Sequence, residues 1–206
     1  MKKQILKKSG LSVAFLLLAS VASSHAVGVS IVNSSFEAPG GASNVFTPPN
    51  SWVATGAAFT EISTGVPLSN GDGARHAGIS SSGSYTQDLG VAYQPLTTYT
   101  LTVAIANRQT GNPGVLSGTS SFGLTDASGT LGSTQEAGVV GTFTDYTFTF
   151  TTGASAPTGN VGVVLSAAGG RGLFDNVRLD ATAVPEPSAA LLGGLGLLGL
   201  LVRRRR

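Results

Sequence analysis

Strict alternation of apolar and polar residues constrains the fold of this 206-residue chain more than any other feature. The stretch TYTLTVAIA (98–106) carries Tyr, Leu, Val and Ile at its odd-numbered positions. YTFTFTT (146–152) and NVGVVLSA (160–167) repeat the pattern. A period of two, in residues that are β-branched or aromatic, is typical of strands with one buried face. The sequence therefore predicts at least three half-buried strands.

Short runs of glycine, asparagine, serine and proline separate further, weaker strand patterns, and no long stretch has helical periodicity. Such runs favour tight turns. Weaker strands are expected at 29–32, 58–63, 74–79, 84–89, 119–125 and 173–179, and a long surface loop at 39–50. About nine short strands with frequent turns predict an all-β fold, an antiparallel β-sandwich.

The stretch LFDNVRL (173–179) breaks the alternation, because Phe174 and Val177 both resemble core residues but have opposite parity. A bulge at Asp175 and Asn176 would let both point inward, and bulges often re-aim a side chain. Alternatively, Phe174 covers the outer face of the sheet. Both interpretations stay open at this point.

The first 26 residues have the pattern of a secretory signal peptide. Four lysines precede a short apolar run at 11–21, and Ser24, His25 and Ala26 supply the small-residue cleavage region. We therefore expect signal peptidase to cleave after Ala26. The predicted organisation is a signal peptide at 1–26, a β-sandwich domain at 27–183 and a separate C-terminal segment at 184–206.

Removing both ends changes the electrostatic character of the protein. Residues 27–184 contain four arginines, no lysine and nine acidic residues, which gives a net charge of −5. Binding to nucleic acid needs a basic face, so the sequence excludes that class of partner. The chain has no cysteine, so disulfides cannot stabilise the exported domain.

The last 23 residues, VPEPSAALLGGLGLLGLLVRRRR, resemble the PEP-CTERM sorting signal. Its three elements follow in order: the motif Pro185, Glu186 and Pro187, an apolar helix at 189–202, and the cluster Arg203, Arg204, Arg205 and Arg206. The 14 apolar residues would form a helix of about 21 Å, against a bilayer core of about 30 Å. Cytoplasmic arginines would stop the helix in the membrane.

This resemblance implies that an exosortase, a membrane-embedded cysteine protease or transpeptidase, processes the protein in a Gram-negative bacterium that makes exopolysaccharide. The expected route is signal peptidase, transient insertion of the C-terminal transmembrane helix into the inner membrane, and then the cell surface or extracellular matrix. The alternative is a retained helix that anchors the protein permanently.

The body resembles the galactose-binding-like jelly roll of bacterial carbohydrate-binding modules. The resemblance rests on VNSSFEAP (32–39), SWVATG (51–56), YTQDLGVAYQPLTTYTLTV (85–103) and GLFDNVRLD (172–180). It implies a structural calcium ion between the opening and closing strands, with Glu37 and Asp175 as its ligands. Otherwise Glu37 is a solvated loop acid and Asp175 caps a local turn.

Sugar binding by such a domain uses an exposed aromatic side chain as a platform. Trp52, Tyr85 and Tyr93 are the candidates, with His76 beside them, although a lone tryptophan can equally belong to the core.

Catalytic motifs point away from an enzyme. There is no cysteine nucleophile, only His76 remains after export, and no G-x-S-x-G elbow occurs. The sequence thus predicts an exported, non-enzymatic protein with a structural or adhesive role in an exopolysaccharide matrix. A glycan-binding module is the alternative, followed by an enzyme with paired carboxylates acting on glycosides.

Overall fold

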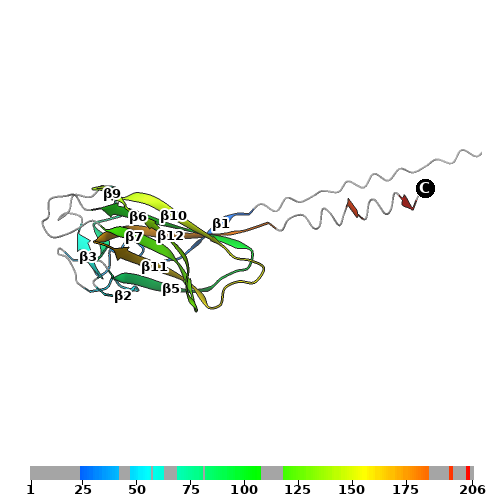
Figure 1. Cartoon of the computed structure of the whole chain (residues 1–206), viewed down its shortest axis with the longest axis horizontal. Helices are drawn as coiled ribbons and strands as arrows, with labels where there is room; N and C mark the ends of the chain where they lie inside the picture. The colour runs from blue at the N-terminus through cyan, green and yellow to red at the C-terminus, as the bar shows by residue number, and fades with distance from the viewer. Residues whose placement is uncertain are drawn as a thin grey trace, which may run out of the picture. The chain divides into compact units, whose positions relative to one another are not determined.

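The structure is a computed structural model, and it describes residues 24–41, 47–56, 58–62, 69–80, 82–107, 118–185, 195–196 and 203–204. Contacts divide the chain into two units, of which 24–185 holds all the strands (Figure 1). The predicted signal peptide before residue 24 lies outside the described residues, as do Glu186, Pro187, Arg205 and Arg206.

Two β-sheets build this unit (Figure 1). The seven-stranded sheet has the order β10-β6-β12-β4-β3, with β1 paired to β12 and β9 to β6. The five-stranded sheet has the order β2-β5-β11-β7-β8. The strands are β1 (Ala26–Val29), β2 (Val53–Thr55), β3 (Ala58–Ile62), β4 (Arg75–Ile79), β5 (Ser84–Ala92), β6 (Thr97–Asn107), β7 (Thr119–Asp126), β8 (Gly129–Glu136), β9 (Val139–Val140), β10 (Thr144–Thr151), β11 (Asn160–Ala168) and β12 (Gly172–Ala183).

Pairing is antiparallel between these strands except for the short parallel pair β6–β9. The predicted all-β sandwich is confirmed. Strand β8 was missed because GTLGSTQE has no apolar alternation. It pairs only with β7 at the sheet edge, where hydrogen bonds rather than apolar burial define the strand.

The core lies between the two sheets and follows the predicted parities. In β6, Tyr99, Leu101, Val103 and Ile105 are at most 2% exposed. The matching positions of β11 are also fully buried: Val161, Val163 and Leu165. Burial of about 20 such side chains, at roughly 1.5–3 kcal/mol each, is the main stabilising contribution in a domain without disulfides.

Strand β12 contains the bulge that the sequence left open. Its register with β6 shifts between Asp175 and Arg178, and Asn176 adopts a left-handed φ of 44°. Phe174 and Val177 are both buried, at 0% and 1% exposure. The bulge is therefore confirmed, and the alternative that Phe174 covers the outer face is wrong. The bulge also turns Asp175 away from the core, beside Ala104 of β6.

The C-terminal segment is described only in small part. Within the predicted apolar helix at 189–202, Leu195 and Gly196 are helical, and Arg203 also has helical conformation. Among the described residues, no helix is long and apolar enough to cross a membrane.

Candidate functional site

A small apolar cluster covers the outer face of the seven-stranded sheet. It consists of Ala104 and Ala106 of β6, Leu173 of β12, and Phe143 just before β10. The ring of His76, on β4, meets Phe143 edge to face at a centroid distance of 5.6 Å. Both rings lie outside the main core, so this face carries a second packed region.

Asp175 belongs to this face. Its partner in the ladder is Ala104, and Ala104 pairs on its other side with Asp145 of β10. Leu173 has the same parity as Asp175 and packs in the apolar cluster. The carboxyl group of Asp175 therefore has apolar neighbours on its own sheet, and the polar turn at 69–73 lies above it.

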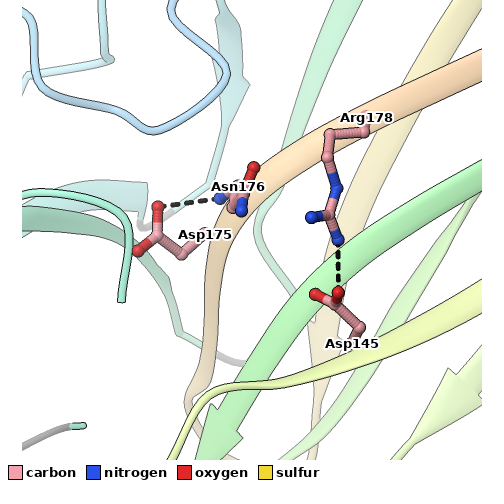
Figure 2. Close-up of polar contacts among 4 residues, drawn as sticks. All are labelled: Asp145, Asp175, Asn176 and Arg178. Carbon is pink, nitrogen blue, oxygen red and sulfur yellow. Dashed lines mark hydrogen bonds and ion pairs between the residues drawn. The ribbon is translucent and has the colours of Figure 1, made fainter. Parts of the chain in front are cut away.

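The turn at 69–73 closes over Asp175, which is only 1% exposed. Oδ2 of Asp175 accepts a hydrogen bond from the backbone N–H of Asp72 at 2.7 Å. Oδ1 accepts one from the backbone N–H of Asn176 at 2.8 Å, which Figure 2 shows. A Cβ at Gly71 would lie 3.1 Å from Oδ2. Glycine at position 71 thus lets the turn approach the carboxyl group closely.

Burial raises the pKa of Asp175 to about 8, and the negative charges of Asp72 and Glu37 add to the rise. The two backbone N–H groups favour the ionised form and lower the pKa, but they do not offset desolvation. Asp175 is therefore largely protonated at neutral pH. A carboxylic acid kept neutral in this way can donate a proton to a bound molecule.

Glu37 holds the same turn from the other side. Its Oε1 accepts hydrogen bonds from the backbone N–H groups of Ala74 and Arg75, at 3.0 and 2.7 Å. Gly73 has a φ of +90°, and a Cβ there would lie 2.5 Å from the same oxygen. Glu37 and Asp175 are thus brought together, as expected for residues after the first strand and in the last one.

The described contacts of this pair are hydrogen bonds from backbone N–H groups. A calcium ion needs several oxygen ligands directed at one point. The described residues contain no group of three or more His, Cys, Asp or Glu side chains that could hold a metal ion. Glu37 and Asp175 accept backbone N–H groups, which complement negative charge. Calcium therefore stays a prediction of the sequence, and the described contacts fit a hydrogen-bonded clasp.

Because the clasp is made of hydrogen bonds, we expect the melting temperature of the mature protein to be the same in calcium and in the chelator EGTA. Differential scanning calorimetry of the wild type and of Glu37→Gln measures it. A rise in Tm with calcium that is present in the wild type and lost in Glu37→Gln would restore the calcium site.

Asp145 and Arg178 lie at the rim of this face. Nη2 of Arg178 is 2.6 Å from Oδ2 of Asp145, and the two side chains are 43% and 54% exposed (Figure 2). An exposed ion pair of this kind contributes at most about 1 kcal/mol. Sequence analysis included both residues only in the net charge. No sequence pattern indicated that they lie near Asp175.

The three predicted platform aromatics are in the core, so that prediction is wrong. Trp52 and Tyr93 are 4% exposed and Tyr85 is 0% exposed. The indole N–H of Trp52 donates to the carbonyl oxygen of Asn33 at 3.1 Å. The hydroxyl of Tyr93 donates to the backbone carbonyl oxygen of Thr125 at 3.0 Å. Inward parity in the five-stranded sheet explains the burial of Tyr85, since it lies between Ala54 and Leu165.

A pocket of about 480 Å³ opens on the outer face of the five-stranded sheet, and sequence analysis did not predict it. Asp88 of β5 and Thr125 of β7 flank Gly162 of β11 in one row. Asn160 donates to Oδ2 of Asp88 at 3.2 Å. The lining comprises Thr86, Gln87, Asp88, Thr125, Asp126, Ala127, Gly159, Asn160 and Gly162.

A two-sheet antiparallel sandwich is a fold that hosts both binding modules and enzymes. The HpiC1-like family, described as HpiC1 cyclase, matches residues 27–180, and the PEP-CTERM protein-sorting motif matches residues 183–206. The chain belongs to the HpiC1-like cyclase family and carries a PEP-CTERM sorting motif.

Solved structures agree on the fold. A cyclase from Fischerella sp. TAU, in complex with 4-(1H-indol-3-yl)butan-2-one, is 22% identical with a TM-score of 0.64, over 77% of this chain and 98% of that one. The Stig cyclase Fisc from Fischerella sp. TAU, in complex with (3Z)-3-(1-methyl-2-pyrrolidinylidene)-3H-indole, is also 22% identical, with a TM-score of 0.62, over 78% and 100%. TmCBM61, in complex with beta-1,4-galactotriose, is 16% identical with a TM-score of 0.48, over 72% and 95%. No curated protein sequence matches this chain.

The prediction that the exported domain is not an enzyme is therefore wrong, because the family to which the chain belongs is described as a cyclase family. That prediction relied on motifs for nucleophilic and metal chemistry. A single buried carboxylic acid leaves no motif of that kind, because its reactivity comes from desolvation in the folded domain. The predicted PEP-CTERM signal is confirmed, and it marks the protein as exported and processed at the membrane.

Proposed function

We propose that this protein is an exported enzyme that closes a ring, or isomerises a π-bonded substrate, by proton donation from Asp175. The observation that carries the proposal is the burial of Asp175, which is 1% exposed beneath the turn at 69–73, and this burial raises its pKa to about 8. The carboxylic acid protonates a carbon–carbon double bond, a nucleophilic atom of the same molecule captures the cation, and the carboxylate takes back a proton. Substrate and product then have the same mass.

Apolar, aromatic molecules are the substrate class that this face favours. Phe143, Leu173 and the two alanines of β6 form an apolar cluster on the face that carries Asp175. The Fischerella cyclases hold indole compounds, which supports the same class here. Access needs movement of the turn at 69–73. The hydrogen bond from the N–H of Asp72 to Asp175 holds this turn, as does the hydrogen bond between the hydroxyl groups of Ser69 and Thr142.

Binding of 4-(1H-indol-3-yl)butan-2-one to the mature protein tests the location of the site. In ¹H–¹⁵N NMR spectra we expect the amides of Asp72, Phe143 and Asp175 to shift first. Asp180→Asn, an exposed carboxylate on the same strand, should leave the shifts unchanged, whereas Asp175→Asn should weaken them. Shifts confined to the five-stranded sheet, or no binding, would contradict the proposal.

Glycan binding is a second candidate function, supported by the pocket around Gly162. The pocket offers two carboxylate acceptors, the amide of Asn160 and two threonine hydroxyls, a mixture that suits vicinal hydroxyl groups. Hydrogen bonds from Ser128 lower the pKa of Asp126, so its carboxylate is ionised and disfavours anions. Retardation in native gels containing exopolysaccharide, lost in Asp126→Asn but kept in Asp180→Asn, tests this function. Equal retardation of both variants would contradict it.

The destination of the processed protein is the last part of the proposal. The PEP-CTERM motif supports release to the cell surface or the exopolysaccharide matrix, where a structural or adhesive role could accompany catalysis. Intact mass of the protein isolated outside the cell tests it. We expect a chain that starts near residue 27 and lacks the arginine cluster, and a retained cluster would mean a permanent anchor.

A further inference from the structure

The folded domain leads into the sorting motif without a linker. Strand β12 pairs with β6 up to Ala183, which lies opposite Thr97. The backbone N–H of the next residue, Val184, donates to the carbonyl oxygen of Leu96 at 2.7 Å. Pro185, the first residue of the motif, follows directly. The hydrogen bond between Val184 and Leu96 thus immediately precedes the motif that the membrane enzyme recognises.

A rigid pair of turns fixes the carbonyl group of Leu96. Thr152 is 3% exposed; its Oγ1 accepts from the N–H of Thr97 at 2.9 Å and donates to the carbonyl of Gln94 at 2.7 Å. Backbone hydrogen bonds from Leu96 to Gly153 and from Thr152 to Thr97 close the arrangement, at 3.0 and 2.9 Å. The position of Val184 is therefore set by the domain and not by a flexible tail.

The N-terminal end of the domain lies at the same place. Ala26 of β1 pairs with Thr182 of β12, next to the end of the ladder. Figure 1 shows β1 at the opposite end of the sandwich from β3 and β9. Asp175 is eight residues upstream of Ala183 on β12, which is about 26 Å along an extended strand. Asp175 is thus remote from Ala26 and Ala183, where the domain joins its N-terminal and C-terminal export segments.

The two turns at this end carry no charged residue of their own, although Asp126 lies beside them, next to Ala127, whose N–H donates to the carbonyl oxygen of Thr158. The turn segments 93–98 and 151–158 contain no Asp, Glu, Lys or Arg. Leu96 is 36% exposed and Val184 39% exposed. A surface of this composition can lose its water at a protein contact without the cost of desolvating an ion.

We propose that these two turns, which we call the exit turns (93–98 and 151–158), dock against the membrane enzyme that processes the PEP-CTERM motif. The chain reaches at most about 3.6 Å per residue. The three residues from Pro185 to Pro187 therefore extend at most about 11 Å from the domain. An enzyme that binds these three residues has to approach the exit turns. The Leu96–Val184 hydrogen bond fixes the start of this segment on the domain, and so limits the distance between the domain and the enzyme.

Processing of the full chain in cells that contain the membrane enzyme tests this contact. We expect the double variant Leu96→Glu and Ser155→Glu to be processed about tenfold more slowly, because two unpaired charges enter the interface. Inserting six Gly and Ser residues between Val184 and Pro185 should restore the rate, since the motif then reaches the enzyme without the domain. Pulse-chase labelling followed by intact mass measures both.

The matched control is Ser133→Glu with Gln135→Glu, which adds the same charge to exposed positions of β8. It should be processed at the wild-type rate, and the melting temperatures of all released domains should agree within about 2 °C, a stability change below about 0.5 kcal/mol. Equal rates for the exit-turn variant and the wild type would overturn the proposal. So would slow processing that the linker does not restore, because that result places the defect in folding or in the bilayer.

Discussion

Replacing Trp52 with alanine is expected to lower the free energy of unfolding by about 3–5 kcal/mol. The indole ring is 4% exposed and lies 5.2 Å from the ring of Phe36 and 6.4 Å from that of Tyr85, between ring centroids. Alanine would leave a cavity among these aromatic rings and remove one of the two hydrogen bonds to the carbonyl oxygen of Asn33, which still accepts from the N–H of Phe36. Urea unfolding followed by circular dichroism measures the loss.

Val53→Ala is the control, because Val53 is adjacent in sequence but 65% exposed, so its replacement should change the free energy of unfolding by no more than about 0.5 kcal/mol. A loss below about 1 kcal/mol for Trp52→Ala would show that the indole ring is not part of the core. It would then be available as a sugar platform after all.

Replacing Asp175 with asparagine is expected to reduce turnover by about 100-fold or more, because the amide cannot donate the proton. A panel of alkenyl indoles, scored by a change in chromatographic retention at constant mass, supplies the assay. Wild-type turnover should fall as the pH rises through about 8, the pKa of the acid. Asp180→Asn should keep both the rate and the pH profile, and an active Asp175→Asn enzyme would contradict the assignment.

The same substitution has a stability signature with a definite sign. The pKa of Asp175 is higher in the folded domain, about 8, than the ordinary aspartate value of 3.8, so the folded state binds more protons between these values. The free energy of unfolding of the wild type should therefore decrease as the pH rises from about 4 to about 8. Asp175→Asn should lack this component, and equal slopes in both proteins would mean that the carboxyl group is not buried.

Most of the sandwich could be predicted from the sequence, because apolar and polar residues alternate along a strand that has one buried face. Strands β6, β10 and β11 follow from it, and the bulge follows from the opposite parities of Phe174 and Val177. Alternation does not say which parity faces the core when both faces carry polar residues. In β5, Tyr85 and Gln87 point inward, and Thr86 and Asp88 line the pocket.

The site was only half predictable for a related reason. The sequence brought Glu37 and Asp175 together through the order of first and last strands, and the structure places both on the turn at 69–75. It could not show that their partners are backbone N–H groups, because those depend on the path of the turn. Nor could it show that burial raises the pKa of Asp175.

The proton on Asp175 is the central claim, and ¹³C NMR of the side-chain carboxyl groups tests it most directly. Aspartate labelled at Cγ, with Asp175→Asn for assignment, gives one titration curve for each residue between pH 3 and 10. We predict a midpoint of about 8 for Asp175. A midpoint near 4 would mean that the group is ionised at neutral pH, and Asp175 could not be the acid.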